Sequence, residues 1–277
     1  MYQLKCLENG FKYIEVHNEV CSAKIALQGA HIFEYTKNNS ANLLWLSEAS
    51  AFEDGIAIRG GIPICWPRFG SLDTTMPQHG FARTQEFKLV SLKETNNTVE
   101  LKLVLSDTKK SREVWNHKFE LEVTIILSES LNISLKTTNL DKEEFMITQA
   151  LHTYFSVSSI KNIHIKGLED EEYYDALLNS TNKESKSIVI NREIDRVYQH
   201  KNREIILYDG KKIILLKTQG SESTIVWNPW IKKCSTMSNM QKNDYKSFVC
   251  IESANAFDDF KLIKSSQNHT LSLTVSF

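Results

Sequence analysis

The fold is decided by a short run of alternating residues, Leu121-Glu122-Val123-Thr124-Ile125-Ile126-Leu127. Apolar side chains occupy every second position of this run, and Glu122 and Thr124 stand between them. Successive side chains of a β-strand point to opposite faces of a sheet, so this period predicts a strand with one buried face. The same alternation recurs on both sides of the run, at residues 101–105, 133–135 and 271–277. The chain is therefore expected to contain several half-buried strands.

Strand signals cover much of the remaining chain. Runs rich in Val, Ile, Thr, Tyr and Phe, many of them bounded by Asn, Asp or Gly, occur at residues 11–17, 22–36, 144–156, 161–167, 203–208, 212–217, 223–228 and 247–253. Asp209-Gly210 separates two of these runs and predicts a tight hairpin. Helical signals are few, with a turn or two expected within residues 42–52 and 234–245. Residues 179–193 are expected to form a surface loop.

The order of these signals predicts an all-β protein. Strand and helix do not alternate regularly, which argues against a doubly wound parallel sheet. More than a dozen short strands, without Gly- or Ser-rich linkers or internal repeats, indicate one large antiparallel β-sandwich with few short helices. We therefore expect residues 1–277 to form a single domain.

The composition limits the partners and the compartment. The formal net charge is −1, so no global field attracts nucleic acid or an anionic membrane surface. No apolar run approaches the roughly 20 residues that span a bilayer, and residues 1–19 lack the apolar segment of a signal peptide. The five cysteines are odd in number and include no C-x-x-C pair, so neither a disulfide framework nor a zinc site is indicated. We expect a soluble cytoplasmic protein that binds neither nucleic acid nor membrane.

Prolines and glycines concentrate in one segment, residues 59–83. Three of the four prolines and four of the ten glycines lie there, which predicts a shaped, irregular loop. This segment also carries arginines, a histidine and aromatic residues, namely Arg59, Trp66, Arg68, Phe69, His79, Phe81 and Arg83. Guanidinium groups and aromatic faces in a rigid loop suit an anionic, hydroxyl-rich ligand. The alternative is a well-packed loop whose arginines are merely solvated.

Ionisable residues in three other segments are candidates for chemistry. His152, in the apolar segment 149–155, is either a general acid or a core histidine bonded to a carbonyl group. Glu252, in an apolar strand signal, is either an inward-facing general base or a solvent-facing residue at the strand end. Asp195, in a charged run, either binds sugar hydroxyls or lies on a solvated loop. Trp227 and Trp230 either line a pocket or pack the end of the sandwich.

Several site classes lack their motifs in this sequence. There is no G-x-G-x-x-G after a strand and no G-x-x-x-x-G-K-[ST], so nucleotide phosphate cradles are not predicted. There is no G-x-S-x-G elbow of a serine hydrolase. No two of the eight histidines have the close spacing of a zinc motif such as H-E-x-x-H. Neither a metal nor a cofactor is expected.

Six motifs, in order, resemble those of one family. They are R-G-G-I-P-I-C-W-P-R-F-G (59–70), P-Q-H-G-F-A-R (77–83), A-L-H-T-Y-F (150–155), R-E-I-D-R-V-Y (192–198), W-N-P-W (227–230) and C-I-E-S-A (250–254). Together they resemble the glucose-6-phosphate 1-epimerases, which are hexose-6-phosphate mutarotases of the aldose 1-epimerase superfamily. The resemblance extends from about residue 20 to the C-terminus and implies a galactose mutarotase-like β-sandwich, in agreement with the alternation.

The resemblance also implies a set of site residues. By the family pattern, His152 is the catalytic acid and Glu252 is the catalytic base. Substrate binding is assigned to the loop residues Arg59, Gln78, His79 and Arg83, and to Asp195, which binds sugar hydroxyls. The 6-phosphate explains the abundance of arginine in segment 59–83, because an enzyme acting on a free sugar has no dianion to neutralise. The expected partner is a small sugar phosphate, and the expected state is a monomer.

The implied reaction is the interconversion of the α and β anomers of an aldohexose 6-phosphate, with glucose 6-phosphate as the expected substrate. Glu252 removes the proton of the O1 hydroxyl, His152 protonates the ring oxygen O5, and the C1–O5 bond opens. Rotation about C1–C2 and closure complete the exchange without a cofactor. One alternative is a non-catalytic sugar-phosphate sensor on the same fold, which needs neither His152 nor Glu252. A glycosidase needs two carboxylates flanking the bond, and a pure interaction domain leaves this constellation unexplained.

Overall fold

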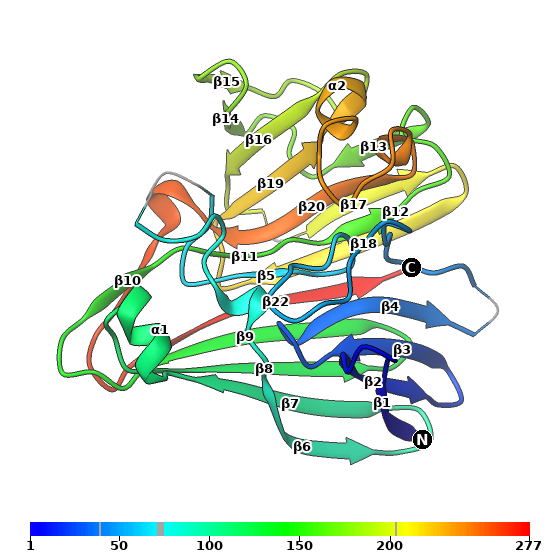
Figure 1. Cartoon of the computed structure of the whole chain (residues 1–277). Coiled ribbons are helices and arrows are strands. Elements are labelled where there is room, and N and C mark those ends of the chain that lie inside the picture. The colour runs from blue at the N-terminus through cyan, green and yellow to red at the C-terminus, as the bar shows by residue number, and fades with distance from the viewer. Residues whose placement is uncertain (39, 71–74, 203) are drawn as a thin grey trace.

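The chain folds into antiparallel sheets, two of which are large and stack on each other (Figure 1). The structure is a computed structural model, and it describes residues 1–38, 40–70, 75–202 and 204–277. Arg203, the first residue of one expected strand, lies outside the described residues. The antiparallel β-sandwich predicted from the alternating pattern is confirmed.

The lower sheet in Figure 1 contains the sequence that predicted the fold, as strand β8 (Phe119–Leu127). Every second residue of β8 is buried, and Val123 lies opposite Leu135 of the next strand. In spatial order the sheet consists of β13 (Ile163–Lys166), β17 (Glu204–Asp209), β18 (Lys212–Gln219), β22 (Asn268–Ser276), β9 (Leu131–Asn139), β8, β7 (Val99–Ser106) and β6 (Lys88–Glu94). The hairpin expected at Asp209-Gly210 joins β17 to β18.

The upper sheet holds the residues that matter for function. In spatial order it consists of β15 (Ser180–Lys183), β14 (Glu172–Asp175), β16 (Ile194–Gln199), β19 (Ser223–Asn228), β20 (Phe248–Asn255), β11 (Gln149–Leu151) and β5 (Ile64–Cys65), with β12 (Tyr154–Ser156) also paired to β20. All eight residues of β20 are buried, because both faces of this strand are covered. β20 is therefore a central strand with two different surroundings.

Smaller elements flank the two sheets. A meander of four strands lies beside the lower sheet, namely β1 (Tyr2–Cys6), β2 (Lys12–His17), β3 (Cys21–Ala26) and β4 (His31–Lys37), and a short ribbon pairs β10 (Phe145–Ile147) with β21 (Lys261–Ile263). The helices are α1 (Lys109–Val114) and α2 (Trp230–Cys234), with 3-10 turns at Ala82–Thr84, Asp244–Lys246 and Phe257–Asp259. No helix within the described ranges is long and apolar enough to cross a membrane.

Two helical expectations are corrected by the structure. Residues 42–52 form no helix, because Leu44 and Leu46 make isolated β-bridges and Trp45 donates its backbone N–H to Tyr154. Within 234–245, only the ends are helical: α2 finishes at Cys234 and a 3-10 turn begins at Asp244. The helix begins earlier than expected because the Asn228 side chain accepts a hydrogen bond from the Trp230 N–H.

Other differences concern element boundaries. The expected strand 22–36 is two strands joined by a turn, and 144–156 contains three short strands. The charged run 191–198 contains β16, a strand whose side chains are all at least half-buried. Residues 179–193 are mostly exposed as expected, but they include the edge strand β15.

Two separate apolar clusters cover the two faces of the upper sheet. The larger cluster fills the space between the sheets and includes Val249 and Ile251 of β20. It also contains Trp66 and Phe81, so these two aromatic residues of the 59–83 loop pack the core rather than a ligand. The smaller cluster includes Cys250 and Tyr154 and covers the opposite face of the sheet. Glu252 lies on this second face, because it is two residues from Cys250 on the same strand.

Candidate active site

His152 and Glu252 are brought opposite each other by strand pairing. In the register of β11 and β12 with β20, Leu151 pairs with Ser253 and Tyr154 pairs with Cys250. His152 lies between the two short strands and therefore faces Glu252. The backbone of this break is held in place, since the His152 N–H donates to Pro63 O at 3.0 Å and the Thr153 carbonyl accepts from the Ile251 N–H.

The two side chains form a close, buried pair. His152 Nε2 lies 3.4 Å from Glu252 Oε1, and the exposed fractions of the two residues are 9% and 1%. Burial raises the pKa of Glu252 well above its ordinary value, and the neighbouring Asp195 charge adds to this rise. Burial also lowers the pKa of His152 well below its ordinary value, and the electrostatic effects of His79 and of the positively charged Arg83 and Arg59 act in the same direction. A carboxyl and an imidazole with opposed pKa shifts are suited to exchange a proton.

Aromatic rings surround this pair. The Tyr154 ring stacks on His152, with centroids 4.9 Å apart and planes 9° apart. Trp227 and His79 approach His152 edge-on, at 5.9 and 5.7 Å between centroids. Trp230, by contrast, packs on Tyr245 away from this group, so the two tryptophans of W-N-P-W have different roles. The rings hold the imidazole of His152 in one orientation.

The 59–83 loop brings two arginines to the pair. Arg59 donates from Nη1 to the Tyr154 hydroxyl at 3.3 Å, and Arg83 donates from Nη2 to the backbone carbonyl of Gln78 at 2.9 Å. Gln78 thus contacts Arg83 through its backbone, while its side chain is exposed. Both guanidinium groups lie close enough to lower the pKa of His79.

His79 is held as a neutral ring. Its Nδ1 accepts a hydrogen bond from the Gly70 N–H at 3.3 Å, which leaves the ring proton on Nε2. Burial lowers its pKa to about 3, with Arg83 and Arg59 contributing in the same direction. His79 can therefore donate a hydrogen bond from Nε2 without carrying a charge.

Asp195 lies on β16, two strands away from Glu252. It pairs with Trp227 across the strands, and its carboxylate lies 3.9 Å from Lys233 Nζ of α2. Glu193 shares the same ammonium group at 3.5 Å. Burial raises the pKa of Asp195, although Lys233 acts against this shift. Asp195 can accept hydrogen bonds beside the aromatic face of Trp227.

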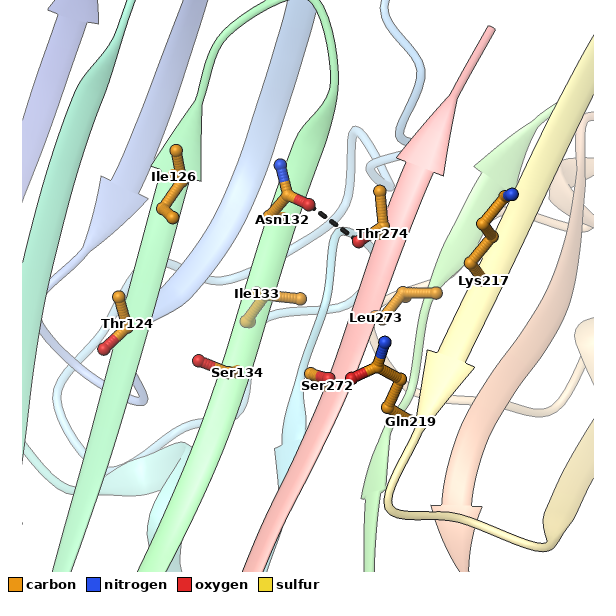
Figure 2. A pocket seen from close by; sticks show the side chains of 10 residues that line it. All are labelled: Thr124, Ile126, Asn132, Ile133, Ser134, Lys217, Gln219, Ser272, Leu273 and Thr274. Atoms are coloured by element: carbon orange, nitrogen blue, oxygen red, sulfur yellow. Dashed lines mark hydrogen bonds between the residues drawn. The ribbon is translucent and has the colours of Figure 1, made fainter. Parts of the chain in front are cut away.

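A separate hollow lies on the opposite side of the sandwich. Figure 2 shows it on the outer face of β8, β9, β22 and β18, where it has a volume of about 320 Å³. Among its polar side chains, Thr274 donates to Asn132 at 2.7 Å, as Figure 2 shows. Lys217 pairs with Glu204, outside the hollow, at 2.7 Å. The hollow contains none of the residues predicted from the sequence, and no ionisable pair like that of His152 and Glu252 lines it.

The structure thus gathers the predicted site residues at one face of the upper sheet, except Gln78, whose exposed side chain leaves only its backbone carbonyl in contact with Arg83. Two further residues join them that sequence reasoning did not assign, Tyr154 and Cys250. Tyr154 follows His152 at the period of two that places both on one face, so the sequence contained a signal for it. Cys250 carries no such signal beyond its spacing from Glu252. Within the described ranges, the set of donors close enough to hold a metal ion is His152, Cys250 and Glu252.

Comparison with known proteins identifies the family of this chain. Residues 12–276 match the sequence profile of aldose 1-epimerase. The chain belongs to the aldose 1-epimerase family. Two curated relatives of this family, from Cenchrus ciliaris and Escherichia coli, both carry the name "Putative glucose-6-phosphate 1-epimerase". They are 34% and 31% identical, over 84% and 92% of this chain and 75% and 87% of their own lengths.

A solved structure supports the same family membership. The crystal structure of a "putative mutarotase" from Salmonella typhimurium aligns with a TM-score of 0.93 and 29% identity, covering 99% of this chain and 92% of the other. Family membership and fold together establish that this chain is an isomerase of the mutarotase type, acting on a sugar.

Proposed function

We propose that this enzyme interconverts the α and β anomers of an aldohexose 6-phosphate, with glucose 6-phosphate as the substrate. The observation that carries the proposal is the position of two arginines beside the acid–base pair. Arg59 donates to the hydroxyl of Tyr154, whose ring stacks on His152, and the charges of Arg59 and Arg83 both lower the pKa of His152. Guanidinium groups bind phosphate through paired, charge-assisted hydrogen bonds. The relatives named above point to the same substrate.

Glu252 and His152 carry the chemistry in this proposal. The Glu252 carboxylate removes the O1 proton while the His152 imidazolium protonates O5, and the C1–O5 bond breaks to give the open-chain aldehyde. Rotation about C1–C2 presents the other face of the carbonyl. In closure, His152 takes back the O5 proton and Glu252 returns a proton to O1. Each proton transfer contributes about 10²–10⁴-fold.

The substrate phosphate favours the charged form that starts ring opening. With one proton between them, the pair exists either as carboxylic acid and imidazole or as carboxylate and imidazolium. Burial favours the uncharged form, and the positive charges of Arg59 and Arg83 further disfavour imidazolium. A phosphate dianion bound by both arginines cancels this repulsion and raises the pKa of His152. Substrate binding and acid formation are therefore coupled.

The sugar ring is bound by neutral and acidic groups around the pair. Asp195 accepts hydrogen bonds from ring hydroxyls, and the neighbouring Trp227 offers an apolar face to the C–H side of the pyranose. His79 donates from Nε2 as a neutral group, and Gln78 shapes the loop by fixing Arg83. We further propose that the chain acts as one domain, because each of these groups comes from a different part of the sequence.

The test measures relaxation of pure α-glucose 6-phosphate towards anomeric equilibrium, by polarimetry and by NMR exchange. We expect the wild type to accelerate relaxation, and Glu252→Gln to lose about 10²–10⁴-fold in kcat. Arg59→Ala should raise KM for the phosphorylated sugar about 10- to 100-fold, since it removes hydrogen bonds to a charged group. Arg112→Ala, on α1 and paired with Asp107, is the control for loss of one positive charge.

Two outcomes contradict the proposal. If free glucose and glucose 6-phosphate relax equally fast with the enzyme, the phosphate assignment is wrong. If the wild type binds glucose 6-phosphate without accelerating its relaxation, the protein is a sugar-phosphate sensor and the acid–base roles are wrong.

A further inference from the structure

Cys250 is a buried thiol that the proposed reaction does not use. It lies two residues before Glu252 on β20 and pairs with Tyr154, so its side chain shares the face of the acid–base pair. The metal-binding atoms of His152, Cys250 and Glu252 all lie within 4.8 Å of one another. A sulfur, an imidazole nitrogen and a carboxylate oxygen therefore converge at one point of the pocket.

The spacing of these atoms fits a small metal ion. Zinc binds such donors at about 2.0–2.3 Å, so donors around one tetrahedral ion lie roughly 3.3–3.8 Å apart. His152 Nε2 and Glu252 Oε1 are already at this spacing, 3.4 Å. The Cys250 sulfur needs to approach by no more than about 1 Å to complete a three-donor site. The fourth position is left for water.

A second observation concerns the other oxygen of the Glu252 carboxyl group. Among the described residues, the buried atom Glu252 Oε2 has no hydrogen-bond partner, although Glu252 is only 1% exposed. Buried carboxylate oxygens without a partner are costly and are normally satisfied by a donor or a cation.

The donor set defines the class of ion. Imidazole with thiolate selects zinc and other thiophilic transition metals, whereas magnesium and calcium require mostly oxygen ligands. We propose that His152, Cys250 and Glu252 form an inhibitory site for a thiophilic divalent cation such as Zn²⁺. The ion takes the lone pairs of His152 and Glu252 that proton transfer requires, so metal binding and turnover exclude each other. The inhibition rests on the proposed function, whereas the binding itself does not.

The binding test uses Co²⁺ as a spectroscopic probe, because a thiolate bound to Co²⁺ gives a near-ultraviolet charge-transfer band. The full-length chain carries Cys6→Ser throughout, since Cys6 is an exposed thiol that would bind the ion on its own. We expect one Co²⁺ per chain with this band, and displacement of Co²⁺ by Zn²⁺. Cys250→Ala should abolish the band, while Cys65→Ala, the matched variant of a thiol in the same apolar cluster, should retain it.

The inhibition test adds Zn²⁺ to the mutarotation assay. We expect reversible loss of activity that EDTA restores, and an inhibition constant at least about tenfold higher in Cys250→Ala than in the parent, each referred to the activity of the same protein without Zn²⁺. Circular dichroism verifies folding, and Cys250→Ser replaces Cys250→Ala if the latter is unfolded. Glucose 6-phosphate should compete with Co²⁺ and reduce the intensity of the charge-transfer band, a measurement that needs no cysteine variant.

The outcomes separate this inference from the proposed function. Absence of a thiolate band in the Cys6→Ser parent, or a band that survives in Cys250→Ala, overturns the metal site even if mutarotation is observed. A band that depends on Cys250 in a protein without mutarotase activity supports the metal site and overturns the proposed function instead.

Discussion

Tyr154 connects Arg59 to the acid–base pair through a single side chain. Its ring stacks on His152, and its hydroxyl accepts from Arg59. Tyr154→Phe removes the hydroxyl and keeps the ring, so we expect KM for glucose 6-phosphate to rise about 3- to 10-fold with kcat within about twofold. Tyr154→Leu also removes the stacking, and kcat should fall at least about tenfold. NMR exchange kinetics measure both, and equal kcat losses in the two variants would contradict separate roles for hydroxyl and ring.

At this same scale, the sequence predicted His152 and Glu252 because each is an ionisable residue in an apolar strand signal, where burial demands a reason. The family motifs then separated chemistry from packing. The sequence could not predict that Trp66 and Phe81 belong to the core. An aromatic residue in a loop gives the same sequence pattern whether its ring faces a ligand or another sheet. The Trp66 indole N–H donates to Thr137 of β9, a partner 71 residues away that no local pattern indicates.

Among the elements, the 59–83 loop depends on Gly80 for the close approach of its second half to Trp66. Gly80 has φ +69°, and a Cβ at this position would lie 2.1 Å from the Trp66 carbonyl oxygen. That oxygen accepts from the Phe81 N–H at 3.0 Å, so Gly80→Ala must disrupt the backbone that carries His79 and Arg83. We expect a loss of unfolding free energy of about 3 kcal/mol or more, together with reduced activity on glucose 6-phosphate, measured by urea unfolding and by the relaxation assay.

The matched control for this glycine lies in the β17–β18 hairpin. Gly210 has φ +63°, but a Cβ there would meet no atom within 4 Å. Gly210→Ala should therefore cost only the left-handed backbone penalty, about 1–2 kcal/mol, and leave activity unchanged. Equal destabilisation by the two substitutions would show that conformation alone, rather than contact with Trp66, decides the effect at Gly80.

The elements that the sequence predicted best are those with a strict period of two and one buried face, such as β8 and β9. Prediction failed where tertiary contacts set the backbone. Residues 42–52 form backbone hydrogen bonds with β12 and with the 59–83 loop, instead of the internal bonds of a helix. The strand β16 was not predicted, because its sequence is a charged run. In the folded sheet, Arg196 pairs with Glu184 and packs on the Tyr173 ring, and no local sequence pattern indicates these partners.

For the whole molecule, buried histidines tie stability to pH. His31 is fully buried at the junction of β4 and the 59–83 loop, where its Nε2–H donates to Gly60 O at 2.8 Å. Within the described part of the chain, its Nδ1 has no hydrogen-bond partner, so a proton bound to this nitrogen would have no acceptor. Burial lowers its pKa from 6.5 to about 3, and the positive charge of Arg83 acts in the same direction. Burial also lowers the pKa of His79, in the same loop, to about 3.

The sign of the effect follows from proton binding. Between about pH 6.5 and pH 3 the unfolded chain binds a proton at His31 and the folded chain does not, so unfolding free energy falls as the pH is lowered through this window. Each such histidine contributes a slope of up to about 1.4 kcal/mol per pH unit. Urea unfolding between pH 5 and 7 should show this slope. In His31→Gln the slope should fall by about the contribution of one histidine. In His17→Gln, the control at an exposed position, the slope should stay unchanged. Glu252 acts in the opposite sense because its pKa is raised, so the difference between variant and parent isolates His31. An identical slope in His31→Gln and the parent would mean that the fold accommodates a charge between β4 and the loop, and that acid sensitivity arises elsewhere.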